Sequence, residues 1–248
     1  MLSEFYERNY PKIKQNKKRL NILEKTALKR FEKYNKFIKL NCSIYDHGCG
    51  SGLIGKKFIE NRNDIYYKYW DFDTTIIDEL LSKSERAEKI NPLSKEENKF
   101  GCLISFHVLE HVNDPIKYLS KLRKKLKKDS TIIIEVPKLF GRKVSINDLM
   151  VEHLNYFSPK ALQKVLINSF PSHKFVSIDN NLEGVHDTFC IVMLNKDNKE
   201  FKTLKNIKYN CDAKTQINFL SEIIQTNTNL KYFLKYLLKS ILFKLNVI

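Results

Sequence analysis

Short apolar runs alternate with stretches of helical spacing between Cys42 and Lys196. Runs rich in β-branched and aromatic residues predict strands at 43–46, 65–73, 102–106, 130–137, 174–180 and 188–196. Apolar residues three or four positions apart predict helices from about residue 53, over 74–83 and 115–126, and from residue 159. Ser158 can cap the last of these helices, and Pro159 suits its first position. Strands and helices in this order are typical of βαβ units and a parallel sheet.

The segments on either side of this core have a different pattern. The first forty residues carry apolar positions spaced by three, four or seven, which predicts two helices packed as a cap. These positions are Ile13, Leu20, Leu23, Ala27, Phe31, Tyr34 and Ile38. We therefore divide the chain into an N-terminal helical cap (1–40), an α/β core (41–195) and a C-terminal helical extension (196–248). A core of that length matches the usual size of one domain.

The net charge of +16 is concentrated on the two flanks. Residues 1–40 hold 12 Lys and Arg against 4 Glu, residues 196–248 hold 10 Lys against 4 acids, and the rest holds 22 against 20. The flanks thus carry +8 and +6, and the core only +2. Such flanks could contact phosphate, nucleic acid or an anionic membrane surface, although solvated lysine-rich helices have the same composition.

The five cysteines and the chain's hydropathy indicate a cytoplasmic protein. The cysteines include no C-x-x-C pair, as is typical of reduced thiols rather than of disulfides or a zinc site. The opening residues are charged and aromatic, without the apolar stretch of a secretory signal. No uncharged apolar run approaches the ~20 residues that a membrane span requires. Residues 230–248 combine apolar side chains with lysines on one helical stripe, and could lie peripherally on the inner face of the membrane, dock on the domain or mediate homo-oligomers.

The stretch DHGCGSGLIG (46–55) follows the first predicted strand and leads into a helix. Its glycines allow a tight turn whose N–H groups face a ligand at the helix N-terminus. Residues 50–55 also satisfy G-x-G-x-x-G, the dinucleotide fingerprint, and Asp71 and Asp73 could hold ribose hydroxyls of either ligand. Asp46 separates the two interpretations, because a carboxylate beside the loop suits a cationic amino-acid cofactor and repels a pyrophosphate.

Three ordered motifs carry a family resemblance. D-x-G-x-G-x-G (46–52) resembles the first motif of class I S-adenosylmethionine-dependent methyltransferases. CLISFHVLEHVNDPIKYLSKLRKKLK (102–127) is similar to the fourth strand and following helix of one large branch, which carries VLEHVxDP, and EHLNYFS (152–158) is similar to the EHxxYFS segment of sugar and surface-polysaccharide methyltransferases. The resemblance implies a Rossmann-like, seven-stranded, mostly parallel sheet with helices on both faces and one antiparallel edge strand.

The resemblance also implies where S-adenosylmethionine binds. Gly48, Gly50 and Gly52 would approach its methionine and ribose parts, and Asp46 would organise their loop. Asp73 would hold the ribose diol, with Asp71 as the second choice. Phe106 and His107 would line the cofactor floor. No third strand and no adenine-contacting acid can be recognised in residues 88–101.

A hydroxyl acceptor must lose a proton, and histidine has a pKa suited to that task. His153 is the first candidate base, with Glu152 to orient it, and His111 beside Glu110 is the second. Glu110, His111 and Asp114 lie close in sequence, but we expect them on a helix surface and predict no metal site.

The resemblance favours a carbohydrate or nucleotide-sugar acceptor in capsule or lipopolysaccharide biosynthesis. Sugar C-methyltransferases of this group usually carry YHEH where this chain has MVEH (150–153), and begin with a cysteine-rich zinc module that is absent here. We therefore predict O-methylation. An RNA or other small-molecule methyltransferase and a non-catalytic scaffold are the alternatives; nucleic acid is disfavoured because SFHVLEH (105–111) lacks the Pro-Pro-aromatic motif of base-methylating enzymes.

Overall fold

The computed structural model describes residues 17–72, 74–81, 83–93, 97–138, 153–179 and 188–204. Asp73, Glu152 and the segment 230–248 lie outside these ranges, as do the first half of the predicted cap and most of the extension. No helix within the described ranges is long and apolar enough to cross a membrane. The four cysteines described, Cys42, Cys49, Cys102 and Cys190, are buried free thiols, as predicted.

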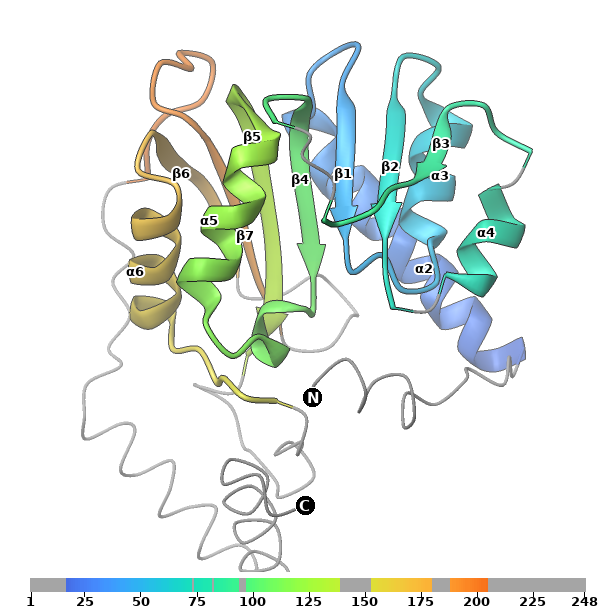
Figure 1. Ribbon diagram of the computed structural model, residues 1–248, viewed down its shortest axis with the longest axis horizontal. Coiled ribbons are helices and arrows are strands. Elements are labelled where there is room, and N and C mark those ends of the chain that lie inside the picture. Colours follow the sequence, from blue (N-terminus) through green and yellow to red (C-terminus); the bar gives the residue numbers. More distant parts are fainter. Residues whose placement is uncertain are drawn as a thin grey trace, which may run out of the picture.

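One seven-stranded sheet forms the centre of the described chain, in the order β3-β2-β1-β4-β5-β7-β6 (Figure 1). Its strands are β1 Ser43–His47, β2 Tyr66–Trp70, β3 Ala87–Lys89, β4 Phe100–Phe106, β5 Leu126–Pro137, β6 His173–Asp179 and β7 Thr188–Asn195. Neighbouring strands are parallel except for β7, which is antiparallel to β5 and β6. The predicted Rossmann-like, mostly parallel sheet is confirmed.

The predicted position of the antiparallel strand was wrong. β7 does not form the edge but lies between β5 and β6, and every one of its residues is buried. β6 forms the edge, and most of its residues are partly exposed. An apolar strand such as TFCIVMLN is stable inside a sheet, whereas the more polar HKFVSID tolerates an edge.

Helices cover both faces of the sheet (Figure 1). α2 Lys17–Tyr34, α3 Leu53–Asn61 and α4 Thr75–Leu81 lie on one face, and α5 Pro115–Lys125 and α6 Pro159–Ser169 on the other. Two short 3-10 turns, η1 Asn35–Phe37 and η2 Leu109–His111, complete the described elements. Ser158 caps α6 as predicted, because its hydroxyl accepts a hydrogen bond from the N–H of Ala161 at 3.3 Å.

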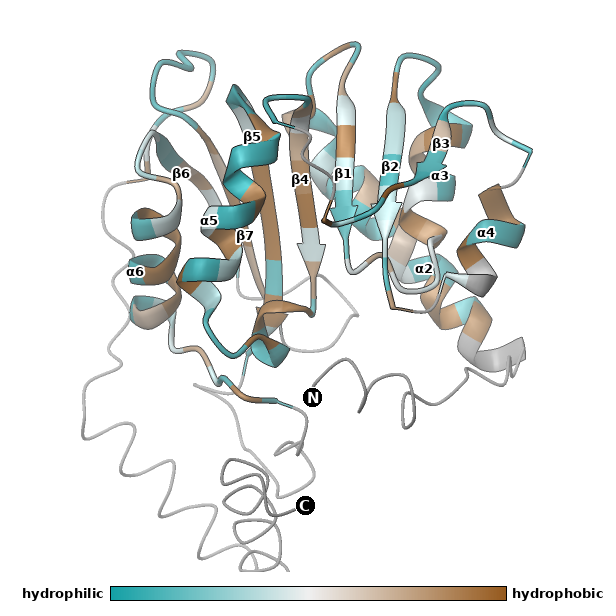
Figure 2. Ribbon diagram, viewed as in Figure 1, coloured by the Kyte–Doolittle hydropathy of each residue, from teal (hydrophilic) through white to brown (hydrophobic). Residues whose placement is uncertain are grey.

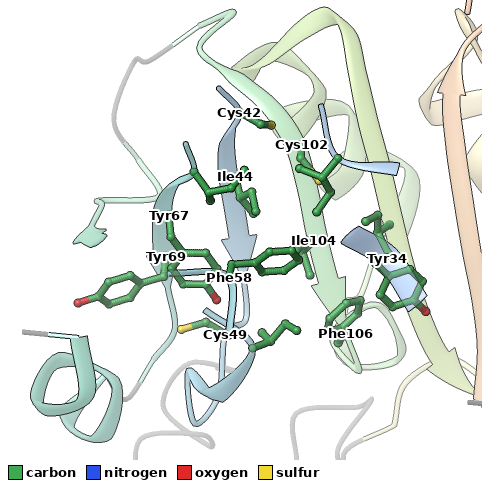
Figure 3. Close-up of a cluster of buried hydrophobic side chains, with 14 of the residues drawn as sticks. Tyr34, Cys42, Ile44, Cys49, Phe58, Tyr67, Tyr69, Cys102, Ile104 and Phe106 are labelled. Atoms are coloured by element: carbon green, nitrogen blue, oxygen red, sulfur yellow. The ribbon is translucent and has the colours of Figure 1, made fainter. Parts of the chain in front are cut away.

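The strands bury both faces because alternate side chains enter two separate cores. Ile44, Ile104 and Ile133 point toward α2 and α3, and their neighbours Tyr45, Leu103 and Ile132 or Ile134 point toward α5 and α6. Figure 3 shows part of the first core, with Phe58 of α3 among the strand side chains. β4 and β5 are accordingly hydrophobic over most of their length, whereas the outer side of α5 is hydrophilic (Figure 2).

The third strand, which the sequence did not reveal, is β3. It has only three residues, none of them fully buried, and it extends the sheet beyond β2. A segment this short and polar has no hydrophobic alternation to detect. β5 begins at Leu126, directly after α5, four residues before the predicted start of this strand at residue 130.

A buried carboxylate fastens α2 to the sheet. Glu135 of β5, 1% exposed, accepts hydrogen bonds from the guanidinium of Arg30 at 2.5 and 2.8 Å and from the hydroxyl of Tyr34 at 2.7 Å. The Arg30 guanidinium also lies 4.5 Å from the centre of the Phe106 ring, at the end of β4. The described part of the cap therefore supports the end of the sheet where the parallel strands terminate.

A second buried carboxylate, Asp46, lies at the end of β1 beneath the glycine loop. The Tyr67 hydroxyl donates to it. Burial raises the pKa of Asp46 from 3.8 to about 7, and the negative charge of Asp71 adds to this, against the Tyr67 hydrogen bond and the charge of Arg30. The folded protein therefore holds a proton on Asp46 in a pH range where the unfolded chain releases it.

We predict that Asp46→Asn flattens the pH dependence of stability. Because the pKa is raised on folding, Asp46 stabilises most below its unfolded pKa, and this contribution is lost as the pH rises through about 7. The neutral amide keeps an acceptor for Tyr67 and does not titrate. The unfolding free energy of the variant relative to the unsubstituted protein should rise between pH 5 and 8 by on the order of a few kcal/mol. Denaturant titrations at the two pH values measure this difference, and parallel profiles would contradict it.

Candidate functional site

A cavity of about 360 Å³ opens at the carboxyl ends of β1, β2 and β4. This is the end of a parallel sheet at which ligands bind. The cavity is lined by His47, Gly48, Gly50, Trp70, Asp71, Phe72, Phe106, His107, Val108, His111, Val112, Asn113 and Tyr118. Four of the residues predicted for the cofactor, Gly48, Gly50, Phe106 and His107, are among them, as is His111.

The glycine loop shapes one wall of the cavity. Gly48, Gly50 and Gly52 all have positive φ, which disfavours any residue with a Cβ. A Cβ on Gly48 would strike Val108, and one on Gly52 would strike Ile77 of α4. At Gly50, by contrast, a Cβ would meet no protein atom within 4 Å. Gly48 and Gly52 thus serve the packing of the loop, and Gly50 leaves room on the cavity side.

Asp71, directly after β2, holds this loop and faces the cavity. Its Oδ2 accepts a hydrogen bond from the N–H of Gly50 at 2.7 Å. The loop is also tied to β2, because the N–H groups of Gly48 and Cys49 both donate to the carbonyl of Trp70. Asp71, the second choice from the sequence, thus has a defined place at the cavity, while the preferred Asp73 lies outside the described residues. Asp46 does not line the cavity and acts from below the loop.

Aromatic side chains form another wall of the cavity. The Nδ1 atom of His47 lies 2.6 Å from the Tyr118 hydroxyl, and the His47 ring packs on Trp70 with centroids 4.6 Å apart. Trp70 in turn meets Phe72 edge-on at 4.9 Å. Burial lowers the pKa of His47 to about 3, so this imidazole is neutral at physiological pH. Sequence reasoning missed these residues because they are far apart in the chain, on or next to β1, β2 and α5, and meet only in the fold. His47 also occupies a variable position of the glycine motif.

The floor of the cavity continues from β4 into a sharp turn. His107 has φ of +56°, which is uncommon for a residue with a side chain, and its N–H donates to the carbonyl of Glu135. Phe106 stacks on Tyr34 of α2 with ring centroids 5.6 Å apart (Figure 3). The turn leads the chain from β4 along the cavity to η2, which carries Glu110 and His111.

The two candidate bases meet at the far side of this turn. The rings of His111 and His153 are 4.7 Å apart and nearly perpendicular. The carboxylate of Glu110, 1% exposed, lies beside them, with Oε1 at 3.9 Å from Nε2 of His111 and at 3.4 Å from Nδ1 of His107. Glu110 thus lies beside His111 and His153. Glu152, the residue predicted to orient His153, lies outside the described residues. Asp114 belongs elsewhere, since it caps α5 by accepting from the N–H of Lys117.

Asn155 holds the two motifs together. Its N–H donates to the carbonyl of Glu110 at 2.9 Å, and its side-chain amide donates to the carbonyl of Val112 at 2.5 Å. Both bonds are between segments more than 40 residues apart in the chain. The Asn of EHLNYFS was overlooked in the sequence because its partners are backbone groups, which leave no pattern.

The lining fits a nucleoside-bearing cation. Gly50 provides open backbone, Asp71 provides an acceptor for ribose hydroxyls, and the aromatic wall can cover a base. A cationic amino acid would find the Asp71 carboxylate at the cavity side of the loop, where the same charge would repel a pyrophosphate. This observation agrees with S-adenosylmethionine better than with a dinucleotide.

The comparisons with solved structures agree with this fold. A Haemonchus contortus phosphoethanolamine N-methyltransferase 2 bound to S-adenosyl-L-methionine superposes with a TM-score of 0.56, at 14% identity over 72% of this chain and 45% of its own. A Burkholderia thailandensis 1,6-didemethyltoxoflavin-N1-methyltransferase bound to S-adenosylhomocysteine superposes with a TM-score of 0.54, at 15% identity over 71% of this chain and 79% of its own. The pyocyanin biosynthetic protein PhzM gives 0.53, at 14% identity over 69% and 55%, so the chain spans about half of two of these relatives.

The sequence comparisons give the family. The search of curated proteins finds no match. The profile of the family described as "Methyltransferase domain" matches residues 3–169, about two thirds of the 248 residues. The match includes the glycine loop, the turn after β4 and the segment with His153. The predicted enzyme class and its methyl donor, S-adenosylmethionine, are thereby confirmed, and this chain belongs to the methyltransferase-domain family.

Proposed function

We propose that this protein transfers a methyl group from S-adenosylmethionine to a hydroxyl of a sugar or sugar-linked group, in the biosynthesis of a capsule- or lipopolysaccharide-type polysaccharide. One observation carries the proposal. The EHLNYFS segment, which resembles that of sugar methyltransferases, is fastened against the cavity turn by Asn155, and brings His153 to His111 beside the buried Glu110. Proton-accepting groups thus gather at one end of the donor cavity.

The donor fills the cavity between the glycine loop and the aromatic wall. Gly50 leaves space for its methionine and ribose parts, Gly48 lines the cavity beside them, and Asp71 accepts from its ribose hydroxyls. Trp70, Phe72 and Tyr118 would enclose the adenine, for which the sequence indicated no residue. When bound, S-adenosylmethionine supplies an electrophilic methyl group, which forms a bond to the acceptor oxygen as its bond to sulfur breaks.

The chain must then align the acceptor and remove its hydroxyl proton. His111 lines the cavity, and His153, which is not among the lining residues, packs on the His111 ring. A neutral imidazole of this pair accepts the proton, and the adjacent Glu110 carboxylate stabilises the imidazolium that forms. A hydroxyl acceptor requires such a base, whereas a neutral amine already has an available lone pair.

The acceptor class can be tested with methyl-labelled donor. We would incubate the full chain with ¹³C-methyl S-adenosylmethionine and nucleotide sugars, lipid-linked glycans, RNA and small amines as separate acceptors. A methoxy carbon in the NMR spectrum of a sugar product is the expected result. A methyl bonded to a ring carbon would contradict O-methylation, and transfer only to RNA or amines would contradict a sugar acceptor.

We predict that Gly50→Ala weakens donor binding more than it weakens folding. The φ of +54° costs an alanine on the order of 1 kcal/mol, but the new methyl meets no protein atom and enters the space assigned to the ligand. The affinity for S-adenosylhomocysteine, measured by calorimetry, should fall about 10-fold or more, equivalent to ~1.4 kcal/mol.

Gly52→Ala is the matched control for this prediction. Its methyl strikes Ile77 in the packing between α3 and α4, so thermal stability should fall more than for Gly50→Ala. Unchanged affinity of the Gly50 variant would show that the ligand does not occupy this space.

We predict that Asp71, rather than Asp73, holds the ribose diol. Asp71→Asn should lower the affinity for S-adenosylhomocysteine about 10-fold or more, because a hydrogen bond to a charged group contributes roughly 1.5–3 kcal/mol. For an analogue that lacks the ribose 2′-hydroxyl, the difference between Asp71→Asn and the unsubstituted protein should shrink. Asp73→Asn is the control with the same chemistry two residues away. The reverse pattern, in which only the Asp73 variant loses affinity, would restore the assignment first made from the sequence.

A further inference from the structure

Glu110 is a buried acid whose surroundings do not satisfy it. Neither oxygen of its carboxylate has a hydrogen-bond partner within the described part of the chain. Water cannot readily replace these partners, because the side chain is only 2% exposed. An ionised carboxylate in such a place costs several kcal/mol unless a cation or donors compensate it. The groups nearest to it are imidazoles, which can offer either a proton or a lone pair.

These groups have the composition of a metal site. One ligand atom from each of Glu110, His111 and His153 lies within 4.8 Å of the others. An ion with bonds of about 2.0–2.2 Å holds tetrahedral ligands roughly 3.4 Å apart, so small rotations of the three side chains would suffice. Two imidazoles and one carboxylate form a set that leaves a fourth position open, as catalytic zinc sites do.

We propose that Glu110, His111 and His153 bind one divalent transition-metal ion at the acceptor end of the cavity. From the sequence we expected Glu110 and His111 on a helix surface and therefore predicted no metal site. In the structure they lie on a short 3-10 turn, with the Glu110 side chain buried and the His111 ring against His153. Imidazole ligands favour Zn²⁺ and similar ions over Mg²⁺ and Ca²⁺, which prefer oxygen. His107, whose Nδ1 lies 3.4 Å from Glu110, is placed to support the carboxylate from outside the ligand set.

A metal ion at this site would change how the acceptor hydroxyl loses its proton. This chemical role of the ion rests on the proposed function. His111 lines the donor cavity, so an acceptor hydroxyl near the methyl donor could take the open position on the ion. A bound ion would lower the pKa of that hydroxyl, as it does for water. His107, which also lines the cavity, would take the hydroxyl proton and pass it to solvent. Acceptors with a second oxygen beside the reacting hydroxyl, such as sugar diols, can chelate the ion and are favoured.

Metal binding can be tested without knowledge of the acceptor. We would remove metals from the full chain with a chelator and titrate it calorimetrically with Zn²⁺, Mn²⁺ and Mg²⁺ in turn. We expect one Zn²⁺ per chain, with Mg²⁺ binding far more weakly. Co²⁺ should give the visible absorption of a four- or five-coordinate site. Equal affinity for Zn²⁺ and Mg²⁺, or no saturable binding, would overturn the proposal.

Variants locate the ion. Glu110→Gln and His153→Gln should each lower Zn²⁺ affinity by more than the roughly 10- to 100-fold that loss of an outer partner costs. Asn155→Ala should lower it by about that outer-partner amount, because it frees the two halves of the site from each other. His173→Gln, which changes a buried histidine at Ser130 instead, should bind as the unsubstituted protein does. Unchanged affinity in Glu110→Gln or His153→Gln would overturn the assignment.

Titration with S-adenosylhomocysteine in the presence of chelator distinguishes a failure of the metal site from a failure of the methyltransferase function. Donor binding also shows that a variant is folded. If Glu110→Gln, which changes the more buried residue, does not fold, His153→Gln still tests the metal site. Donor binding without Zn²⁺ binding would leave the methyltransferase function standing and refute the metal site. Zn²⁺ binding that depends on Glu110, without donor binding, would support the metal site and count against the assigned donor cavity.

Discussion

A carboxylate cannot stay ionised in a protein interior without a compensating partner, and this constraint organises the end of the sheet where ligands bind. Three buried acids lie there, at the end of β1, in the turn after β4 and near the end of β5. Glu135 is compensated by the Arg30 guanidinium and the Tyr34 hydroxyl. Asp46 is compensated by a pKa raised to about 7, so that a large fraction of it is protonated at neutral pH, and by the Tyr67 hydroxyl. Glu110 has imidazoles around it, which suit a cation.

Each compensation fixes a different wall of the cavity. The Arg30–Glu135 pair holds α2 against β5 and places the guanidinium on Phe106 at the floor. Asp46 and Tyr67 join β1 to β2 directly below the glycine loop, and Asp71 holds that loop from the cavity side. Glu110 and its histidines lie at the end of the cavity where we propose that the acceptor binds. The proposed donor and acceptor subsites are thus positioned by the same electrostatic requirement, met in three different ways.

The sequence predicted the parts of this arrangement that depend on neighbouring residues. The strand, glycine turn and helix from Ser43 to Asn61 are adjacent in the chain, and periodicity together with positive-φ glycines was enough to place them. β3 escaped notice because three partly exposed residues carry no periodic signal. The place of β7 inside the sheet depends on whether β6 or β7 is more stable at an edge. Neither strand's own sequence answers this, because the two strands must be compared. The pairing of His47 with Tyr118 joins residues 71 positions apart, and nothing local indicates it.

The meeting of the two acceptor motifs shows the same limit and explains how such a site can be built. Each motif was recognisable alone, but the sequence paired His153 with Glu152, its neighbour in the chain, whereas the structure brings it to Glu110 and His111. The link is Asn155, whose hydrogen bonds end on main-chain carbonyls. Backbone acceptors are the same whatever side chains the turn carries, so the docking geometry does not depend on the residues that perform the chemistry. The side chains facing the acceptor can therefore differ while the segment keeps its place beside the donor cavity.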